Sequence, residues 1–345
     1  MTVTNEKKEN RILEVKNLRT TFQTMSGEVQ AVRGTSFHVN EGESVGIVGE
    51  SGCGKSVTML SILHLLDDNA RMEAEEILFE GEDISKYSTT RMRKLNGLKI
   101  GMIFQDPMTS LNPTIAIGEQ IAEAVRVHNR RLSRDQVHRR VIELMELVGI
   151  DQPEQRYGLY PYNFSGGMRQ RSVLAIALAS NPRILFADEP TTALDVTIQA
   201  QILDLLRDVQ QKLGTATVLV SHDLGVVARV ADRVAVMYAG RIVEIGTTEE
   251  IFYDPRHPYT WGLMRSLPAY AQRGEPLYTI PGMPPSLIDP PAGDAFACRN
   301  EYALAIDYEE EPPLFQLSPT HFAATWLLDK RAPKVNPPVG GGFHG

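Results

Sequence analysis

The sequence predicts an α/β fold with a mostly parallel central sheet. Residues 44–49, 184–188 and 217–222 form short, almost continuous apolar runs, as expected of strands that are covered on both faces. Between the second run and the third, apolar residues recur at spacings of three and four and predict an amphipathic helix; they are Ile198, Ile202, Leu205, Val209 and Leu213. A strand, a helix and a strand in this order form a right-handed crossover between parallel strands.

The N-terminal segment has a different pattern. Leu13 and Val15 alternate with charged residues, and Phe37 and Val39 alternate with polar residues. A period of two is typical of strands with one buried face. We therefore expect an antiparallel β subdomain ahead of the parallel strands.

A helical subdomain is expected inside the main part of the chain. A second apolar stripe with helical spacing ends at Gly149 and consists of Val137, Val141, Leu144 and Val148. This stripe falls in a helical insert over about residues 106–175, between two of the motifs described below.

The composition changes after residue 250. Of the 21 prolines, 15 lie beyond this point, including the pairs at 284–285, 290–291, 312–313 and 337–338. Proline lacks a backbone N–H and fixes φ, so we expect this segment not to continue the sheet and the helices. The sequence thus predicts a main domain over residues 1–250 and a Pro-rich C-terminal extension over residues 251–345, with a flexible GGGFHG at its end.

The bulk composition disfavours several classes of protein. A net charge of −8 argues against a protein whose main task is to grip nucleic-acid phosphates, because that task needs a basic face. Two cysteines, Cys53 and Cys298, are too few for a disulfide framework or a Cys-rich metal site, and they fit a reducing cytosol. No apolar run reaches the roughly 18–20 residues that span a bilayer, and the N-terminus lacks the apolar core of a signal peptide. If the protein works at a membrane, other chains must supply the spanning helices.

A phosphate-binding loop follows the first apolar run directly. The segment GESGCGKS, residues 49–56, matches the pattern G-x-x-x-x-G-K-[ST] in the required place after a strand. Its glycines let backbone N–H groups point at a β-phosphate, Lys55 reaches the β- and γ-phosphates, and the Ser56 hydroxyl binds Mg²⁺. The predicted nucleotide-binding residues are Gly49, Glu50, Ser51, Gly52, Cys53, Gly54, Lys55, Ser56 and Val57.

Two adjacent carboxylates end the second apolar run. Asp188 stands at the carboxyl end of the predicted strand, where it can hold the metal and its water shell. Glu189 follows it and can polarise the water that attacks a γ-phosphate. With the phosphate loop, this pair predicts a nucleoside triphosphatase that uses ATP and Mg²⁺.

One further segment is specific to a single family. The stretch FSGGMRQR, residues 164–171, resembles the LSGGQ signature of ABC ATPases, with Phe164 in place of Leu and Met168 in place of Gln. Ser165, Gly166 and Gly167 are kept, and we expect them to contact nucleotide. The sequence is therefore identified as a P-loop NTPase of the ABC ATPase type over about residues 13–246.

Smaller elements of the same family occur in the same order. Gln105 resembles the Q-loop glutamine, residues 193–195 (Ala-Leu-Asp) the D-loop, and His222 the switch histidine, while Phe22 is placed like the aromatic residue that stacks on adenine. The resemblance implies that Gln105, with Ser56 and Asp188, contacts the metal. It also implies that Glu189 activates water, that His222 positions this water and senses the γ-phosphate, and that Lys55 neutralises charge in the transition state.

The resemblance implies that each ATP site is shared between two subunits. In this family the signature of one subunit closes over the ATP that the phosphate loop of another subunit holds. Ser165 and the amides of Gly166 and Gly167, at a helix start, can donate to a γ-phosphate presented across the interface.

The extension resembles that of one subfamily. Residues 253–268, YDPRHPYTWGLMRSLP, resemble the segment that opens the C-terminal extension of oligopeptide and dipeptide importer ATPases. This implies a peripheral protein at the cytoplasmic face of the cell membrane, with a different second ATPase subunit, two transmembrane permeases and an external peptide-binding protein as partners, and no nucleic acid. Import of dipeptides, nickel or another small solute remains an alternative, as do a soluble ABC ATPase that acts on nucleic acid and a subunit that binds ATP without hydrolysing it.

One feature departs from many relatives. Their extension carries four cysteines, and some of them bind an iron–sulfur cluster there. This sequence has Asp294, Asn300, Asp307 and Thr325 at those positions, and Cys298 is out of register. Iron in such clusters needs thiolate ligands, so we predict no iron–sulfur cluster.

Overall fold

The computed structural model describes residues 10–192, 194–270 and 276–339, which form two compact units. The β-rich unit comprises residues 13–38, 45–85 and 220–339, and the helical unit comprises residues 10–12, 39–44 and 86–219, each within the described ranges. The chain passes between the units at residues 12–13, 38–39, 44–45, 85–86 and 219–220. None of the helices in the described ranges is both long enough and apolar enough to cross a membrane.

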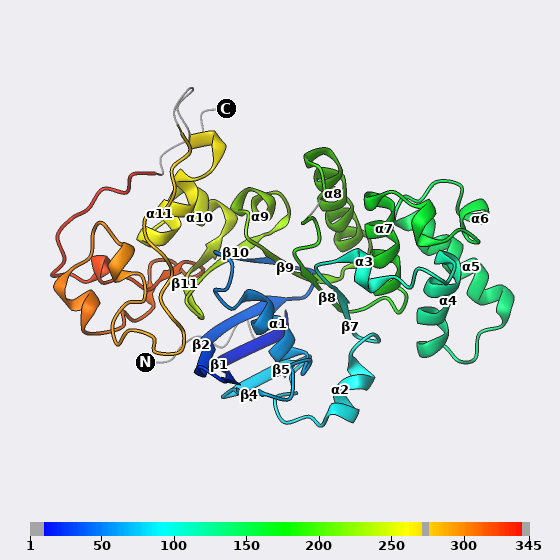
Figure 1. Cartoon of the computed structure of the whole chain (residues 1–345), viewed down its shortest axis with the longest axis horizontal. Coiled ribbons are helices and arrows are strands. Elements are labelled where there is room, and N and C mark those ends of the chain that lie inside the picture. The colour runs from blue at the N-terminus through cyan, green and yellow to red at the C-terminus, as the bar shows by residue number, and fades with distance from the viewer. Residues whose placement is uncertain (1–9, 193, 271–275, 340–345) are drawn as a thin grey trace. The chain divides into compact units, whose positions relative to one another are not determined.

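The elements are labelled in Figure 1. The strands are β1 (Arg11–Thr24), β2 (Gly27–Asn40), β3 (Ser44–Val48), β4 (Ala70–Glu73), β5 (Glu76–Phe79), β6 (Glu82–Asp83), β7 (Ile100–Ile103), β8 (Ile184–Asp188), β9 (Ala216–Ser221), β10 (Arg233–Tyr238), β11 (Arg241–Thr247), β12 (Phe315–Gln316) and β13 (Phe322–Ala323). The α-helices are α1 (Lys55–Ile62), α2 (Thr89–Leu95), α3 (Pro107–Ser110), α4 (Ile117–His128), α5 (Arg134–Leu147), α6 (Pro153–Arg156), α7 (Gly166–Ala177), α8 (Val196–Leu213), α9 (Leu224–Val230), α10 (Thr248–Tyr253) and α11 (Pro258–Arg265).

The predicted antiparallel β subdomain is present in the β-rich unit. Strand order is β2-β1-β5-β6, with β4 beside β1, and β1 runs antiparallel to both β4 and β5. Leu13 lies opposite Phe79 and Val15 opposite Ile77, and all four side chains are buried. The period of two in the sequence therefore marks the face of β1 that packs into the core.

The apolar runs form fully buried strands, as predicted. Every residue of β3, β8 and β9 is buried. In the β-rich unit β3 runs parallel to β10, and in the helical unit β7 runs parallel to β8, with β9 on the other side of β8. Strands covered on both faces need no polar side chain, which explains the continuous apolar runs.

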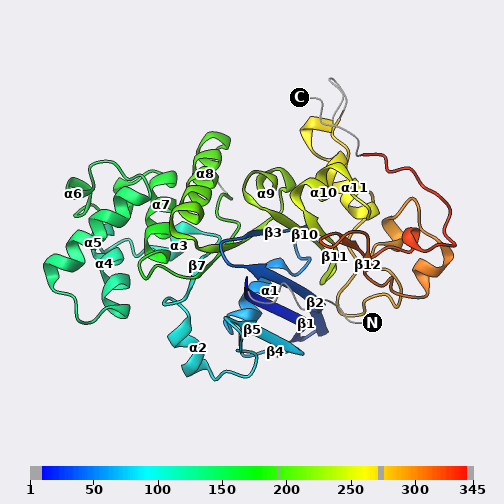
Figure 2. The same ribbon diagram turned by 180° about the vertical axis from the view of Figure 1, so that it is seen from behind.

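The predicted helical subdomain belongs to the helical unit. Helices α4, α5 and α7 pack against one another, and Figures 1 and 2 show them side by side. Helix α5 begins with a capping box between Ser133 and Gln136, and its stripe of Val137, Val141 and Leu144 is buried. Helix α8 also lies where the spacing predicts a helix, and Ile202, Leu205 and Val209 of its stripe are buried, whereas Leu213 at its end is 39% exposed.

The expectation that the extension does not continue the sheet and helices is wrong. Strand β13 pairs antiparallel with β11, with Ala323 opposite Glu244, and β12 pairs with β13. Both added strands are two residues long, and prolines 312–313 and 319 lie outside them, so no ladder position lacks an N–H. The extension also contributes α11. The predicted boundary at residue 250 stays a prediction, while the described part of the extension lies within the β-rich unit.

A buried carboxylate joins the extension to β11. Glu244 is fully buried, and its side chain accepts hydrogen bonds from the N–H groups of Arg256 (2.6 Å) and His257 (3.0 Å). The Nε2 atom of His321 lies 2.8 Å from the same carboxylate. Burial lowers the pKa of His257 to about 3, so this ring is neutral near pH 7, and its Nδ1 accepts the N–H of Tyr259 at the start of α11. These bonds fix where the extension folds back onto the sheet.

Replacing Asp294 by Asn is expected to stabilise the protein more at pH 8 than at pH 5. Burial raises the pKa of Asp294 from the ordinary 3.8 to about 6, although the hydrogen bond from the N–H of Phe296 acts to lower it. Because the pKa is higher in the folded state, the parent loses stability as the pH rises from about 4 through 6, whereas an amide has no such loss. The gain at pH 8 should exceed the gain at pH 5 by about 1 kcal/mol, which urea unfolding at the two pH values would measure.

The matched control for this prediction is Asp289→Asn, which changes an exposed carboxylate of the same extension. Its difference from the parent should be the same at both pH values. An Asp294→Asn effect that is equally independent of pH would contradict the raised pKa.

Candidate functional site

The loop between β3 and α1 has glycines where no side chain fits. A Cβ atom on Gly49 would lie 2.1 Å from the carbonyl oxygen of Met237, and one on Gly54 would lie 2.4 Å from that of Ala31. Gly54 also has a φ of 103°, in the left-handed region, and it directly precedes the first residue of α1. The loop over residues 49–54 therefore packs tightly against neighbouring backbone, while the role of its glycines toward phosphate stays a prediction.

Lys55 folds over this loop. The residue is only 5% exposed, and its ammonium group donates hydrogen bonds to the carbonyl oxygens of Gly49 (2.8 Å) and Glu50 (3.0 Å). Cys53 in the same loop is buried, and this burial raises the pKa of its thiol. Ser56 follows Lys55 in the first turn of α1. A cation and a helix N-terminus thus meet at one end of the loop, an arrangement suited to phosphate.

Glu50 has contacts that sequence reasoning missed. Its N–H donates to the hydroxyl oxygen of Tyr259 (2.8 Å), and its carboxylate forms two hydrogen bonds with Arg299. Tyr259 and Arg299 both come from the extension, 209 and 249 residues away in sequence. The spacing of residues along the chain carries no signal for these contacts. The role of Glu50 in nucleotide binding stays a prediction.

Two more candidates belong to the β-rich unit. Phe22 is half-buried on β1, opposite Ala70 of β4. His222 is exposed and directly follows the last residue of β9. Each thus has a side chain that can reach solvent or a ligand, as its predicted role requires.

In the helical unit, Gln105 and Glu189 meet at the ends of two parallel strands. The side-chain amide of Gln105 donates to Glu189 Oε2 at 3.2 Å, and the hydroxyl of Thr192 donates to the same oxygen at 2.9 Å. Asp188, the last residue of β8, is 7% exposed beside them. Gln105 lies two residues beyond the end of β7, and Asp188 and Glu189 lie at the end of β8, so the parallel pairing of these strands brings all three residues to one edge of the sheet.

The backbone at Glu189 is unusual. Its φ is 44°, in the left-handed region, which costs an L-residue of order 1–3 kcal/mol. Pro190 follows and is buried. Strained conformations at non-glycine residues cluster at functional sites, which fits the role predicted for Glu189.

The signature residues open helix α7. Ser165 is the N-cap, and its hydroxyl accepts the N–H of Met168 at 3.3 Å. Ser165 and Gly166 are exposed, so the N-terminus of this 12-residue helix is open to a ligand. Gly167 is buried, and a Cβ atom there would lie 2.7 Å from Ile198 of α8, so its backbone approaches α8 closely.

The predicted D-loop is described in part. Ala193 lies outside the described residues. Asp195 is the N-cap of α8, where its carboxylate accepts the N–H of Ile198 at 3.0 Å. The candidates therefore fall into two groups, one in each unit, and their roles toward nucleotide and metal remain predictions.

The four residues that stand where many relatives are expected to have cysteines share one structural role. Asp294, Asn300, Asp307 and Thr325 are all buried. Each uses its side-chain oxygen to accept a backbone N–H two or three residues away, from Phe296, Tyr302, Leu304 and Leu327 in turn. These side chains cap turns of the extension. A set made of oxygen acceptors does not fit an iron–sulfur cluster.

Two family models match the sequence. One, described as "ABC transporter", matches residues 32–192, and one described as "Oligopeptide/dipeptide transporter, C-terminal region" matches residues 243–306. The chain is 58% identical to the oligopeptide transport ATP-binding protein OppD of Bacillus subtilis, over 95% of this chain and 92% of the relative. It is 55% identical to the dipeptide transport ATP-binding protein DppD of Lactococcus lactis, over 95% of this chain and 94% of the relative.

Solved structures with the same fold include ATP-binding cassettes. One is a dimeric post-hydrolysis state of the cassette MJ0796 bound to ADP and phosphate, with a TM-score of 0.61 and 26% identity over 68% of this chain and 98% of the other. Another is cbiO1 from Clostridium perfringens, with a TM-score of 0.61 and 28% identity over 71% of this chain and 91% of the other.

Proposed function

Since this chain belongs to the ABC transporter family, we propose that it is the ATP-hydrolysing subunit of an importer for oligopeptides. The observation that carries the proposal is the closely packed loop over residues 49–54, with Lys55 folded over it at the start of α1. The relatives favour this function over the alternatives of nickel import and of an ATPase that acts on nucleic acid.

The substrate is ATP, and the phosphate loop is the proposed site for its triphosphate. Backbone N–H groups at the start of α1 and the ammonium of Lys55 would stabilise the negative charge. The proposed ligands for Mg²⁺ are the Ser56 hydroxyl, the Gln105 side-chain oxygen and the Asp188 carboxylate, and such hard oxygen donors fit this ion. Mg²⁺, when bound, would supply charge neutralisation on the phosphates. Phe22 would stack on adenine.

Hydrolysis would depend on Glu189. Its carboxylate can accept a proton from the attacking water, and the hydrogen bonds from Gln105 and Thr192 to Oε2 fix its orientation. His222 is proposed to position the water and to sense the γ-phosphate. An exposed imidazole after a buried strand can take this role when a ligand reaches it.

A second ATPase subunit is the proposed partner in each ATP site. The exposed N-terminus of α7, with Ser165 and Gly166, offers hydrogen-bond donors to a γ-phosphate held by another chain. The solved cassette with ADP and phosphate is itself dimeric. ATP that touches both subunits only in the closed dimer would favour closure, and hydrolysis of this ATP would let the dimer open again.

Two permease subunits and an external peptide-binding protein complete the proposed importer. The chain would then lie at the cytoplasmic face of the cell membrane as a peripheral protein. Oligopeptide cargo is favoured by the relative with 58% identity, while the relative with 55% identity is a dipeptide transport protein, so dipeptides are the second candidate cargo.

The test of this function is reconstitution of all subunits in lipid vesicles. ATP consumption is expected to rise when peptide-loaded binding protein is added, and labelled peptide should enter the vesicles. The same vesicles with unloaded binding protein give the basal rate of ATP consumption. ATP turnover that ignores loaded binding protein, with no uptake of peptide, would reject the proposed function.

We also propose that the extension holds no iron–sulfur cluster. Its four candidate positions carry oxygen side chains that are already used as turn caps. Purified protein should contain neither iron nor acid-labile sulfide in stoichiometric amounts. Stoichiometric iron and sulfide in an elemental analysis would overturn this statement.

A further inference from the structure

Arg299 of the extension holds the side chain of Glu50 in the phosphate loop. Its Nη1 atom lies 2.6 Å from Glu50 Oε2, and its Nη2 atom lies 2.9 Å from Glu50 Oε1. The two parallel bonds form the bidentate geometry in which a guanidinium recognises a carboxylate most specifically. The Arg299 side chain is 4% exposed and that of Glu50 is 29% exposed, so solvent screens this pair less than an ordinary surface ion pair.

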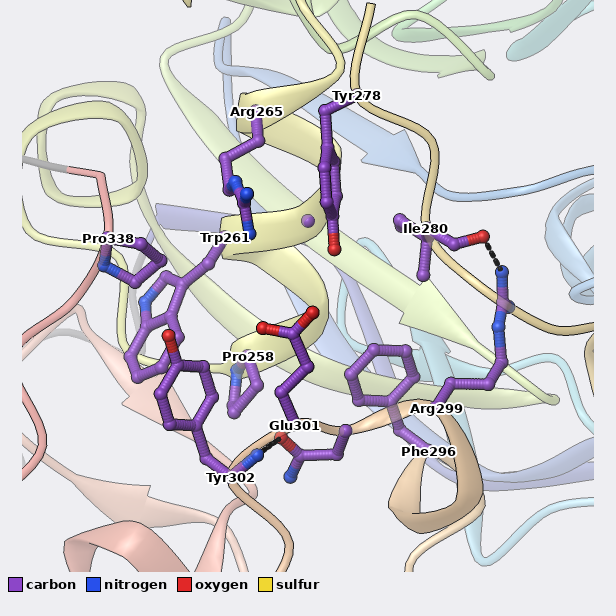
Figure 3. A pocket seen from close by; sticks show the side chains of 12 residues that line it. Pro258, Trp261, Arg265, Tyr278, Ile280, Phe296, Arg299, Glu301, Tyr302 and Pro338 are labelled. Atoms are coloured by element: carbon purple, nitrogen blue, oxygen red, sulfur yellow. Dashed lines mark hydrogen bonds between the residues drawn. The ribbon is translucent and has the colours of Figure 1, made fainter.

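Other contacts fix the position of Arg299. Its Nε donates to the carbonyl oxygen of Pro281 at 2.8 Å, and its Nη1 also lies 3.2 Å from the Tyr238 hydroxyl. Figure 3 shows the guanidinium beside Ile280, whose carbonyl oxygen accepts a bond of 3.4 Å, on the wall of a small pocket in the extension. The nearby carboxylate of Glu50 raises the pKa of Arg299. The extension therefore presents a fixed cation to the loop.

A second contact holds the backbone of the same loop residue. Tyr259 of α11 is fully buried, and its hydroxyl accepts the N–H of Glu50 at 2.8 Å. The Tyr259 ring packs against Tyr238 and Phe296, with ring centroids 4.6 Å and 5.3 Å away. The main chain and the side chain of Glu50 are thus both held by residues outside the phosphate loop, and all of these residues belong to the β-rich unit.

We propose that Arg299 is a positioning residue for the phosphate loop and that, through Glu50, the extension sets the affinity of this subunit for ATP. The inference rests on the proposed function of the loop. It makes the extension part of the machinery for nucleotide binding, in addition to its packing against β11.

The physical reason lies in the place of Glu50 within the loop. The carbonyl oxygens of Gly49 and Glu50 are the two that accept hydrogen bonds from Lys55. A loop whose second residue is held at both N–H and carboxylate samples fewer conformations, so a larger fraction of molecules is ready to bind phosphate. Release of Glu50 lowers that fraction and weakens the apparent affinity by the same factor.

The experiment compares the full chain with Arg299→Gln. With a non-hydrolysable ATP analogue and Mg²⁺ in calorimetry, the Kd should rise about tenfold, inside the range of 5–150-fold that is typical of coupling between sites. In ATPase assays KM should rise about tenfold while kcat changes less than about threefold, because ground-state and transition-state binding weaken together. Arg299→Lys keeps the charge without the two-pronged geometry and should lie between the parent and Arg299→Gln.

Two further variants separate positioning from a loss of folding. Arg265→Gln removes another extension arginine that lines the same pocket and stacks on Tyr278, with no bond to the loop, and it should bind the analogue like the parent. Glu50→Gln should raise Kd about as much as Arg299→Gln, and the double variant no more than the stronger single variant, because both remove one interaction.

The outcomes are distinct. An unchanged Kd in folded Arg299→Gln overturns the proposal. A lower kcat at an unchanged KM also overturns it, because that result means only that fewer molecules are active. If Arg299→Gln does not fold, Arg299→Lys decides: a higher Kd in the folded variant supports the proposal and an unchanged Kd overturns it. Failure of the parent itself to bind the analogue would instead reject the proposed function.

Discussion

Replacing Glu189 by Gln is expected to leave nucleotide binding intact and to slow ATP hydrolysis at least about 100-fold. The amide has nearly the same shape and keeps an oxygen that can accept the hydroxyl of Thr192. It cannot take a proton from the attacking water, so only the chemical step loses its base. Release of phosphate under single-turnover conditions measures the rate, and calorimetry with a non-hydrolysable analogue measures binding.

The control is Glu146→Gln, the same chemical change at an exposed position of α5 in the same unit. It should hydrolyse ATP like the parent. Near-normal turnover in the Glu189→Gln variant would remove Glu189 from its proposed role. A variant that loses binding as well would show that the carboxylate is needed for the structure of the site.

Replacing Lys55 by Ala is expected to weaken nucleotide binding at least about 100-fold and to abolish peptide import in the reconstituted system. The change removes the only side-chain cation among residues 49–57, the segment that would hold the phosphates. A charge-assisted hydrogen bond to an anion is roughly twice as strong as a neutral one, and its loss leaves less positive charge beside the phosphates in a partly buried site. Calorimetry and uptake of labelled peptide provide the two measurements.

The control here is Lys86→Ala, which removes an exposed lysine of the helical unit and should change neither quantity. Lys55 also donates to two carbonyl oxygens of the loop, so thermal unfolding of the variant is recorded to show that it is folded. Parental affinity together with parental import in Lys55→Ala would refute the proposed role of the phosphate loop.

Much of the fold was predictable because its signals are local. The continuous apolar runs became strands that are buried on both faces, and the alternation at Leu13 and Val15 became one buried face of an antiparallel strand. The stripe from Val137 to Leu144 became the buried side of α5. In each case the period of the apolar residues follows from the geometry of one element and needs no knowledge of its partners.

The residues of the candidate site are predictions from the sequence, but their contacts could not be predicted from it. The sequence indicates that Gln105 and Glu189 are both important, yet the hydrogen bond between them depends on β7 and β8 lying side by side. The left-handed backbone at Glu189 has no signal in composition, since such a conformation is favoured at glycine. Ser165 was expected at the start of a helix, and it is the N-cap of α7. This position has a local signal because a helix cap depends on residues within one turn.

The sequence by itself determined the class of the fold and predicted the phosphate loop, the acidic pair and the signature, because each depends on residue types at short fixed spacings. Only the tertiary structure decided that the Pro-rich extension adds β12 and β13 to the sheet and that Arg299 holds Glu50 across 249 residues of sequence. Strands of two residues have no measurable period, and an ion pair between distant residues leaves no local pattern. Both features arise only when the whole chain packs and each buried N–H and charge must find a partner.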